Sequence, residues 1–102
     1  MAKLVAMYRH PEDPAAFEQH YFSTHVPMAK RIPGLKSYEV SSGPVATPQG
    51  ISDYHLVAEL TFDSLKDLQA ALASPEGMAV GNDLAKFAGA GVELLVFDTR
   101  LV

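Results

Sequence analysis

The side chain with the clearest capacity for chemistry is His25. It belongs to a stripe of residues spaced as one face of a helix. The stripe consists of Phe17, Tyr21, His25, Met28 and Ile32. A neutral imidazole both donates and accepts a proton, and its ordinary pKa of about 6.5 suits acid–base catalysis near neutral pH. The same position also suits a hydrogen-bonded core histidine, so the pattern alone leaves both roles open.

Two tyrosines are the next candidates. Tyr21 precedes His25 by one helical turn, and Tyr8 lies on the first predicted strand. A phenol can place its hydroxyl at a pocket while its ring packs against apolar neighbours, although core aromatic residues fit the same positions. We take His25, Tyr21 and Tyr8 as the candidate catalytic residues. The residues expected to form the apolar wall of a substrate pocket, or the core, are Phe17, Met28, Leu60 and Phe62.

The other histidines form no pattern typical of a metal site. The chain has 4 His and no Cys, and its carboxylates do not cluster with the histidines in the sequence. We therefore expect no metal and no bound cofactor. His10 and His20 are expected on the surface. His55 and Glu59 share one face of a predicted strand, where they form either a buried pair or hydrogen bonds across a dimer interface.

The elements that position these residues follow from hydrophobic periodicity and from helix-start signals. Asp13 and Pro14 open the first helix, and Ser64 begins a capping box for the second. Pro27 removes a backbone hydrogen bond, so a kink or break is expected near His25–Val26. The predicted strands are 3–9, 35–45, 53–63 and 92–97, the first helix is 14–32, helical turns start again at 74–76 and 83–87, and a turn-rich loop covers 43–52.

The order of these elements predicts an α+β fold. It is the ferredoxin-like β-α-β-β-α-β arrangement, an antiparallel four-stranded sheet with both helices on one face, in a single domain over residues 1–102. The first and last strands are apolar on both faces, so the second face of the sheet needs a cover. The same face of a second copy provides it. We therefore expect a homodimer in which two sheets form a dimeric α/β barrel.

Composition and charge exclude several classes of function. With 8 Lys+Arg against 12 Asp+Glu and a net charge of −4, the chain has no basic patch for nucleic acid. No run approaches the roughly 18 apolar residues of a membrane span, and the first residues do not resemble a signal peptide. We expect a cytoplasmic protein with no nucleic-acid partner and no membrane partner.

Several segments together resemble the EthD family, which is named after a protein encoded with an ethyl tert-butyl ether degradation system. The most specific are the His-x-Pro-x-Ala stretch that begins at His25 and the Ala-Ser-Pro-Glu-Gly stretch that begins at Ala73. Further matches are Met7-Tyr8-Arg9, Ile32-Pro33-Gly34-Leu35, Tyr38-Glu39-Val40 and Leu60-x-Phe62-Asp63-Ser64-Leu65. The resemblance implies a dimeric α/β barrel of the ferredoxin-like type. It supports a role for His25 and, less directly, for Tyr21 and Tyr8.

The resemblance does not by itself name a reaction. Proteins that share the barrel include monooxygenases, cyclases, dehydratases, isomerases and haem-degrading enzymes, and many use a histidine or tyrosine in an apolar pocket without a bound cofactor. The expected function is that of a small enzyme or accessory catabolic protein acting on a small apolar or cyclic metabolite. His25 would be its acid or base, in oxidoreductase, isomerase or lyase chemistry. A non-catalytic carrier that uses the same pocket, and a structural dimer without a ligand, are the alternatives.

Overall fold

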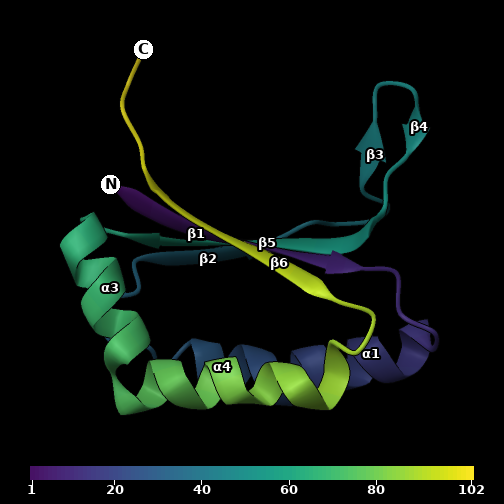
Figure 1. The fold of residues 1–102 in the computed structure, drawn as a ribbon, viewed down its shortest axis with the longest axis horizontal. Coiled ribbons are helices and arrows are strands. Elements are labelled where there is room, and N and C mark those ends of the chain that lie inside the picture. Colours follow the sequence, from purple (N-terminus) through teal and green to yellow (C-terminus); the bar gives the residue numbers. More distant parts are fainter.

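A four-stranded antiparallel sheet organises the chain, and the helices pack on one of its faces (Figure 1). The computed structural model describes residues 1–102. The strands are β1 (Ala2–Arg9), β2 (Ser37–Val40), β5 (Tyr54–Phe62) and β6 (Val92–Asp98), and a separate pair is formed by β3 (Ala46–Thr47) and β4 (Gly50–Ile51). The helices are α1 (Pro14–His20), the π-helical segment η1 (Tyr21–His25), α2 (Val26–Ala29), α3 (Leu65–Ala73) and α4 (Pro75–Phe87). The strand order in the main sheet is β2-β5-β1-β6.

This arrangement confirms the predicted ferredoxin-like α+β fold. Every second residue of β1 is buried under the helices, namely Ala2, Leu4, Ala6 and Tyr8. They join alternate residues of β5, together with Phe17 and Tyr21 from the first helix and Leu68 from α3, in one core cluster. The two-residue period of the strand therefore places Tyr8 on the face of the sheet that the helices cover, which is the face toward His25.

The first helix differs from the single helix expected over 14–32. The helical path ends at Ala29, and its middle part, Tyr21–His25, is π-helical. The Val26 N–H bonds to the Tyr21 carbonyl, five residues back along the chain. Such a π-helical turn inside an α-helix is rare and is frequently found at functional sites.

Two residues explain this change of hydrogen-bond register. Pro27 has no N–H to donate, and the Ser23 hydroxyl donates to the carbonyl of Gln19, a contact that often bends helices. The interruption expected near His25–Val26 therefore takes the form of a π-helical turn rather than a break. His25 and Val26 both keep right-handed helical dihedral angles.

Ser74 separates two helices that follow each other directly along the chain. Its hydroxyl accepts a hydrogen bond from the Gly77 N–H (3.0 Å) as the N-cap of α4. The short helix expected over 83–87 is part of α4, which runs without interruption for 13 residues. Glycine is required at 77, because a Cβ there would lie 2.1 Å from the Ala71 carbonyl oxygen of α3. No helix in the structure has the length and apolar character needed to cross a membrane.

The second strand is shorter than the 35–45 segment predicted for it. β2 covers only Ser37–Val40, after which the chain leaves the sheet. The turn-rich stretch contains a small β3–β4 hairpin that projects beyond the sheet, away from the helices (Figure 1). Ser52 ties the base of the hairpin by donating from its hydroxyl to the Val45 carbonyl (2.6 Å).

A β-bulge changes the predicted face of His55. The register between β1 and β5 shifts after Tyr8, which leaves His55 as an extra residue on β5. His55 therefore turns to the helix side, where its ring meets Phe17 edge-on with ring centroids 5.0 Å apart. Glu59 stays on the opposite face, 3.4 Å from Lys3. His55 and Glu59 are thus not a pair.

Apolar side chains remain uncovered along β6. They are Leu94, Leu95, Val96 and Phe97, each between 41% and 50% exposed. β6 is an edge strand. Leu95 is paired with Val5 of β1 and Phe97 with Lys3, on the face of the sheet that the helices leave open.

Candidate active site

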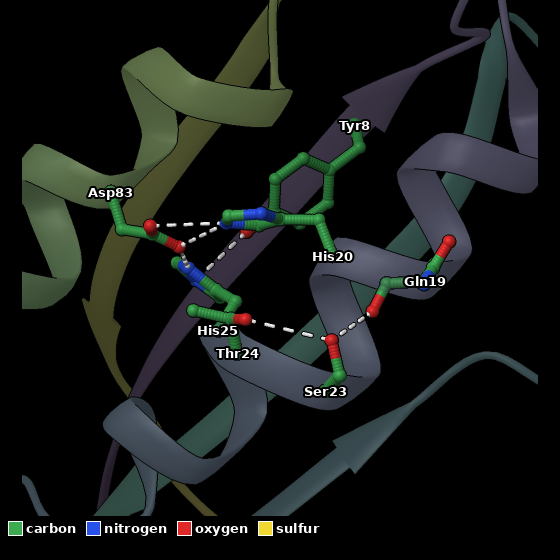
Figure 2. A network of polar contacts seen from close by, with 7 residues as sticks. All are labelled: Tyr8, Gln19, His20, Ser23, Thr24, His25 and Asp83. Atoms are coloured by element: carbon green, nitrogen blue, oxygen red, sulfur yellow. Dashed lines mark hydrogen bonds and ion pairs between the residues drawn. The ribbon is translucent and has the colours of Figure 1, made fainter.

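A carboxylate shared by two histidines lies between α4 and the first helix (Figure 2). Asp83 Oδ2 is 2.8 Å from His25 Nδ1, and the two Asp83 oxygens lie 3.0 and 3.1 Å from His20 Nε2. His25 and Asp83 are 4% and 3% exposed. His20, expected on the surface, is half-buried because it bonds Asp83 and its ring stacks on Phe87.

The π-helical turn explains how both histidines reach one carboxylate. His20 ends α1 and His25 ends the π-helical segment, five residues later. At 3.6 residues per turn, positions five apart in an α-helix point to different sides. A π-helical turn closes its hydrogen bonds over five residues, which brings such positions onto the same side. Asp83 meets them there from α4.

The network sets the charge and tautomer of each group. Burial alone would raise the pKa of Asp83, but hydrogen bonds from His25 and His20 outweigh burial, and the Asp83 pKa is lowered. Burial lowers the pKa of His25, and the Asp83 carboxylate opposes this shift without cancelling it. At neutral pH Asp83 is therefore ionised and His25 is neutral, with Nδ1–H donated to Asp83. His25 Nε2 is left as a proton acceptor.

Tyr8 lies next to the free nitrogen of His25, Nε2. Its hydroxyl oxygen lies 3.5 Å from His25 Nε2, a long contact, and the residue is 2% exposed. Burial raises the pKa of Tyr8, and the charges of Tyr38 and Asp83 raise it further. Tyr8 is thus a neutral phenol, which donates a hydrogen bond and resists ionisation.

Tyr21 is connected to a different partner. Its hydroxyl lies 2.6 Å from that of Tyr38, a residue of β2, and its ring stacks near His25 with centroids 5.3 Å apart. Burial raises the pKa of Tyr21, and the neighbouring Tyr38 raises it further. The first helix, β1 and β2 therefore each contribute a polar group to one buried aromatic cluster.

An apolar cavity of about 80 Å³, here called the Tyr8 cavity, lies beside this cluster, between the sheet and α4. Its lining includes Tyr8, Tyr21, Tyr38, Leu60 and Phe62. At roughly 30 Å³ for each liquid water, the space equals about two or three water molecules. The exposed residues Leu72, Gly81 and Leu94 also line it, so the cavity opens to the surface between α4 and β6.

Three of the residues proposed from the sequence lie outside this lining. Phe17 is buried, but it packs among the rings of Tyr8 and Tyr21 behind the cavity wall. Met28 is half-buried farther along the helical path. His25 reaches the cavity only through the Tyr8 hydroxyl, because its own ring is enclosed.

The sequence reasoning missed Asp83. It lies 58 residues from His25 along the chain, and only the packing of α4 on the first helix brings the two together. A usable signal existed, because Asp83 is a carboxylate on the inward stripe of an otherwise apolar helical face, with Val80 and Leu84 as neighbours. Tyr38, which lies on a predicted strand, is a second residue of the site that the sequence does not single out.

Known structures share the fold. A mutant form of SnoaB, a cofactor-independent oxygenase from Streptomyces nogalater, is 20% identical, with a TM-score of 0.64 over 99% of this chain and 93% of that one. A dimeric ferredoxin-like protein of unknown function from Thermobifida fusca is 14% identical, with a TM-score of 0.70 over 96% and 90%. At these identities the likeness concerns the fold alone.

Two relatives are much closer. An ethyl tert-butyl ether degradation (EthD) family protein from Bacillus halodurans is 41% identical, with a TM-score of 0.90 over 98% of this chain and 99% of that one. An uncharacterized 11.0 kDa protein from the thcB-thcC intergenic region of Rhodococcus erythropolis is 39% identical over 100% of this chain and 98% of its own length. The EthD domain model matches residues 9–91. The chain therefore belongs to the EthD family.

Proposed function

We propose that the protein is a small acid–base enzyme that acts, without a bound cofactor, on a small apolar or cyclic metabolite in the Tyr8 cavity. One observation carries the proposal. Tyr8 lines an apolar cavity, while its hydroxyl faces the free nitrogen of His25, a neutral histidine whose other nitrogen is held by an ionised carboxylate. A proton acceptor oriented by a third group is the arrangement that general-base catalysis requires.

The geometry suits proton transfer through Tyr8. A weakly acidic substrate group gives its proton to the Tyr8 oxygen while the Tyr8 proton passes to His25 Nε2. The substrate keeps the electron pair, and the imidazolium that forms is stabilised by Asp83. Return of a proton to a different substrate atom completes an isomerisation, and expulsion of a leaving group completes an elimination. Asp83 is the positioning residue, since it holds the His25 tautomer and touches no substrate.

Hydrogen–deuterium exchange tests this chemistry without knowledge of the natural substrate. Cyclopentanone is cyclic and apolar, and its carbon-bound protons next to the carbonyl exchange with D₂O when a base removes them. It is larger than the enclosed space of about 80 Å³, so part of its ring would lie in the opening between α4 and β6. The wild-type protein is expected to accelerate this exchange above the buffer background, as followed by proton NMR. Tyr8→Phe, which keeps the ring, is expected to reduce the acceleration by about 10²–10⁴-fold.

A second variant ties the exchange to the cavity. A Cβ built at Gly81 has no atom within 4 Å, so Gly81→Leu extends into open space beside α4 and fills the cavity. It should abolish exchange while leaving Tyr8, His25 and Asp83 intact. Exchange that persists in Gly81→Leu at the wild-type rate would contradict a reaction in this cavity.

The position of His25 favours one alternative, a non-catalytic carrier of small apolar molecules. The imidazole does not line the cavity, and its contact with Tyr8 is long at 3.5 Å. A carrier would bind cyclopentanone, detected as NMR shift changes that disappear in Gly81→Leu, and would not accelerate exchange. Binding without exchange over a panel of cyclic ketones and lactones decides for the carrier.

The proposal includes a homodimer. The exposed apolar residues of β6 and the open face of the sheet support it, and the T. fusca neighbour is described as dimeric. Obligate interfaces of this type bury about 2,000 Å² or more. Sedimentation equilibrium should give twice the chain mass at micromolar concentration, and Leu95→Lys should shift it toward monomer. A stable wild-type monomer under these conditions would exclude the dimer.

A further inference from the structure

A second and larger pocket lies toward the β2 edge of the sheet, whereas the Tyr8 cavity opens toward the β6 edge. Its volume is about 620 Å³, and it lies between the first helix, the chain after β2 and the start of β5. We call it the Glu18 pocket. The residues that line it include Glu18, His55, Phe22, Val45, Ile51 and Leu56. No residue lines both this pocket and the Tyr8 cavity. A volume between about 300 and 1,000 Å³ is typical of sites for small molecules.

The pocket wall holds a polar pair whose hydrogen bonding is incomplete. His55 Nε2 lies 3.3 Å from Glu18 Oε1. The two groups are not aligned for a hydrogen bond at this distance, so the buried His55 Nε2 has no hydrogen-bond partner, and the buried Glu18 Oε2 has none either. Buried polar atoms without a partner are rare in folded proteins, and each needs an explanation. A partner in the pocket supplies one when the Glu18 side chain, which lines the pocket and is 45% exposed, turns and uncovers these atoms.

The backbone is arranged to put His55 there. Regular alternation along β5 would leave His55 on the outer face of the sheet, beside Val57. The bulge after Tyr8 turns it to the helix side, against Glu18. Bulges commonly re-aim a side chain next to a functional site.

The far side of the pocket is also held in place. His10 Nε2 lies 2.9 Å from the Ser52 carbonyl oxygen, which ties the hairpin to the end of β1. The Ser41 hydroxyl accepts from the Val57 N–H at 3.0 Å, which fixes the chain as it leaves β2. The pocket is therefore preformed on both sides.

The chemistry of the walls defines the ligand class. Phe22, Val45, Ile51 and Leu56 present apolar surface, and Phe22 and Ile51 are 49% and 82% exposed. A carboxylate ligand would be repelled by Glu18, and an ammonium fits only the tautomer in which His55 Nε2 carries no proton. A hydroxyl donates to Glu18 and accepts from an N–H of His55, so one group satisfies both atoms.

We propose that the Glu18 pocket is a binding site for small apolar molecules that carry a hydroxyl group, held between Glu18 and His55. The Glu18 side chain is 45% exposed, so it turns toward the ligand without disturbing the core. The site is separate from Tyr8, His25 and Asp83 and does not depend on the reaction proposed for them.

Phenol and its methyl ether, anisole, are matched probes for this site. The two have the same ring, but only phenol has a hydrogen to donate to Glu18. In ¹⁵N–¹H NMR titrations of the intact protein, phenol is expected to shift the amide signals of 41–45 and 54–56 at millimolar concentration. Anisole is expected to bind at least tenfold more weakly.

Variants separate the polar contact from the apolar walls. Glu18→Gln, at a half-exposed helical position, should weaken phenol binding at least fivefold. Ile51→Ser, on the exposed hairpin, should weaken phenol and anisole alike. Glu12→Gln, an exposed carboxylate outside the pocket, and Gly81→Leu, in the Tyr8 cavity, should leave phenol binding unchanged.

Three outcomes would overturn the proposal. One is the absence of amide shifts with 20 mM phenol, which would leave water as the partner of the two unpaired atoms. Another is equal affinity for phenol and anisole, which would reduce the site to an apolar surface. The third is a set of shifts confined to residues of the Tyr8 cavity and lost in Gly81→Leu.

Discussion

The molecule contains two histidine–carboxylate pairs, and they differ in almost every physical respect. His25 and Asp83 meet at 2.8 Å, are nearly fully buried and leave no oxygen of the carboxylate unpaired, since His20 takes part as well. His55 and Glu18 meet at 3.3 Å, are partly exposed and leave one oxygen and one nitrogen without partners. The first pair lies behind a cavity of about 80 Å³ and the second beside a pocket of about 620 Å³.

This difference shows what each pair can do. A tight buried pair fixes tautomer and charge, and a group so fixed can act on a proton repeatedly with the same geometry. A loose pair beside open space has unused hydrogen-bonding capacity, which a ligand can take up. A histidine next to a carboxylate can therefore form either of two kinds of site, one suited to proton transfer and one suited to ligand binding. The burial of the pair and the completeness of its hydrogen bonding distinguish these two kinds.

Removing the carboxylate of each pair should give the largest contrast. Asp83→Asn replaces an anion that accepts from two N–H groups by an amide that also donates, so one histidine loses its partner in a buried site. We expect the free energy of unfolding to fall by about 2–4 kcal/mol. Glu18→Gln should change it by about 0.5 kcal/mol or less. Urea unfolding of the two variants and wild type measures both, and similar losses would contradict the contrast.

The buried pair should also make stability depend on pH. The pKa of His25 is lowered in the folded state by burial, so between that value and about 6.5 the unfolded chain binds more protons, and stability falls as the pH falls. The pKa of Asp83 is also lowered in the folded state, by its histidine partners acting against burial. Its contribution is therefore lost only below about pH 4.

A single substitution isolates the contribution of His25 to the pH dependence of stability. His25→Gln keeps a donor toward Asp83 and an acceptor toward Tyr8 but cannot titrate. In urea unfolding from pH 7 down to pH 4.5, the variant should lose less stability than wild type. An identical decline in both proteins would show that His25 does not titrate differently in the folded and unfolded states.

How far the sequence predicts the molecule depends on the range of the interactions involved. The four strands, the helix starts at Asp13 and Ser64 and the buried face of β1 follow from local alternation and capping, which depend on neighbouring residues. The family resemblance agreed with them. The placement of Tyr8 under the helices is of the same local kind, since it needs only the two-residue period of a strand.

The sites depend on longer-range packing, which the sequence does not display. Asp83 joins His25 only when α4 packs on the first helix, and His20 joins them only because the helical register changes to π. His55 reaches Glu18 only because of a β-bulge, since regular alternation of side chains along β5 would place His55 on the opposite face of the sheet. Pro27 and Ser23 signalled an irregularity in the helix, but not that it would align two histidines five residues apart.

The second donor to Asp83 should matter less than the carboxylate itself. His20 is partly exposed, and in His20→Gln the carboxylate still accepts from His25. We expect a loss of about 1 kcal/mol in the free energy of unfolding, the typical value of one hydrogen bond. Thermal and urea unfolding check this value. A loss equal to that of Asp83→Asn would mean that His20 is as essential as the anion, and the two-donor description would be wrong.

A small effect of the opposite sign is expected at Gly81, the glycine at the mouth of the Tyr8 cavity. Gly81 lies within α4, its φ is not positive, and an added Cβ meets no atom within 4 Å. Gly81→Ala should therefore stabilise the protein by about 0.5–1 kcal/mol, because alanine loses less conformational entropy in a helix. Gly77→Ala, four residues earlier in the same helix, is the control and should destabilise, since its Cβ would collide with the Ala71 carbonyl. Urea unfolding of the two variants compares two glycines that both line the cavity, one with open space beside it and one packed against the end of α3. A loss of stability in Gly81→Ala would mean that the space beside residue 81 is not open, and that the buried pair lies behind a closed wall.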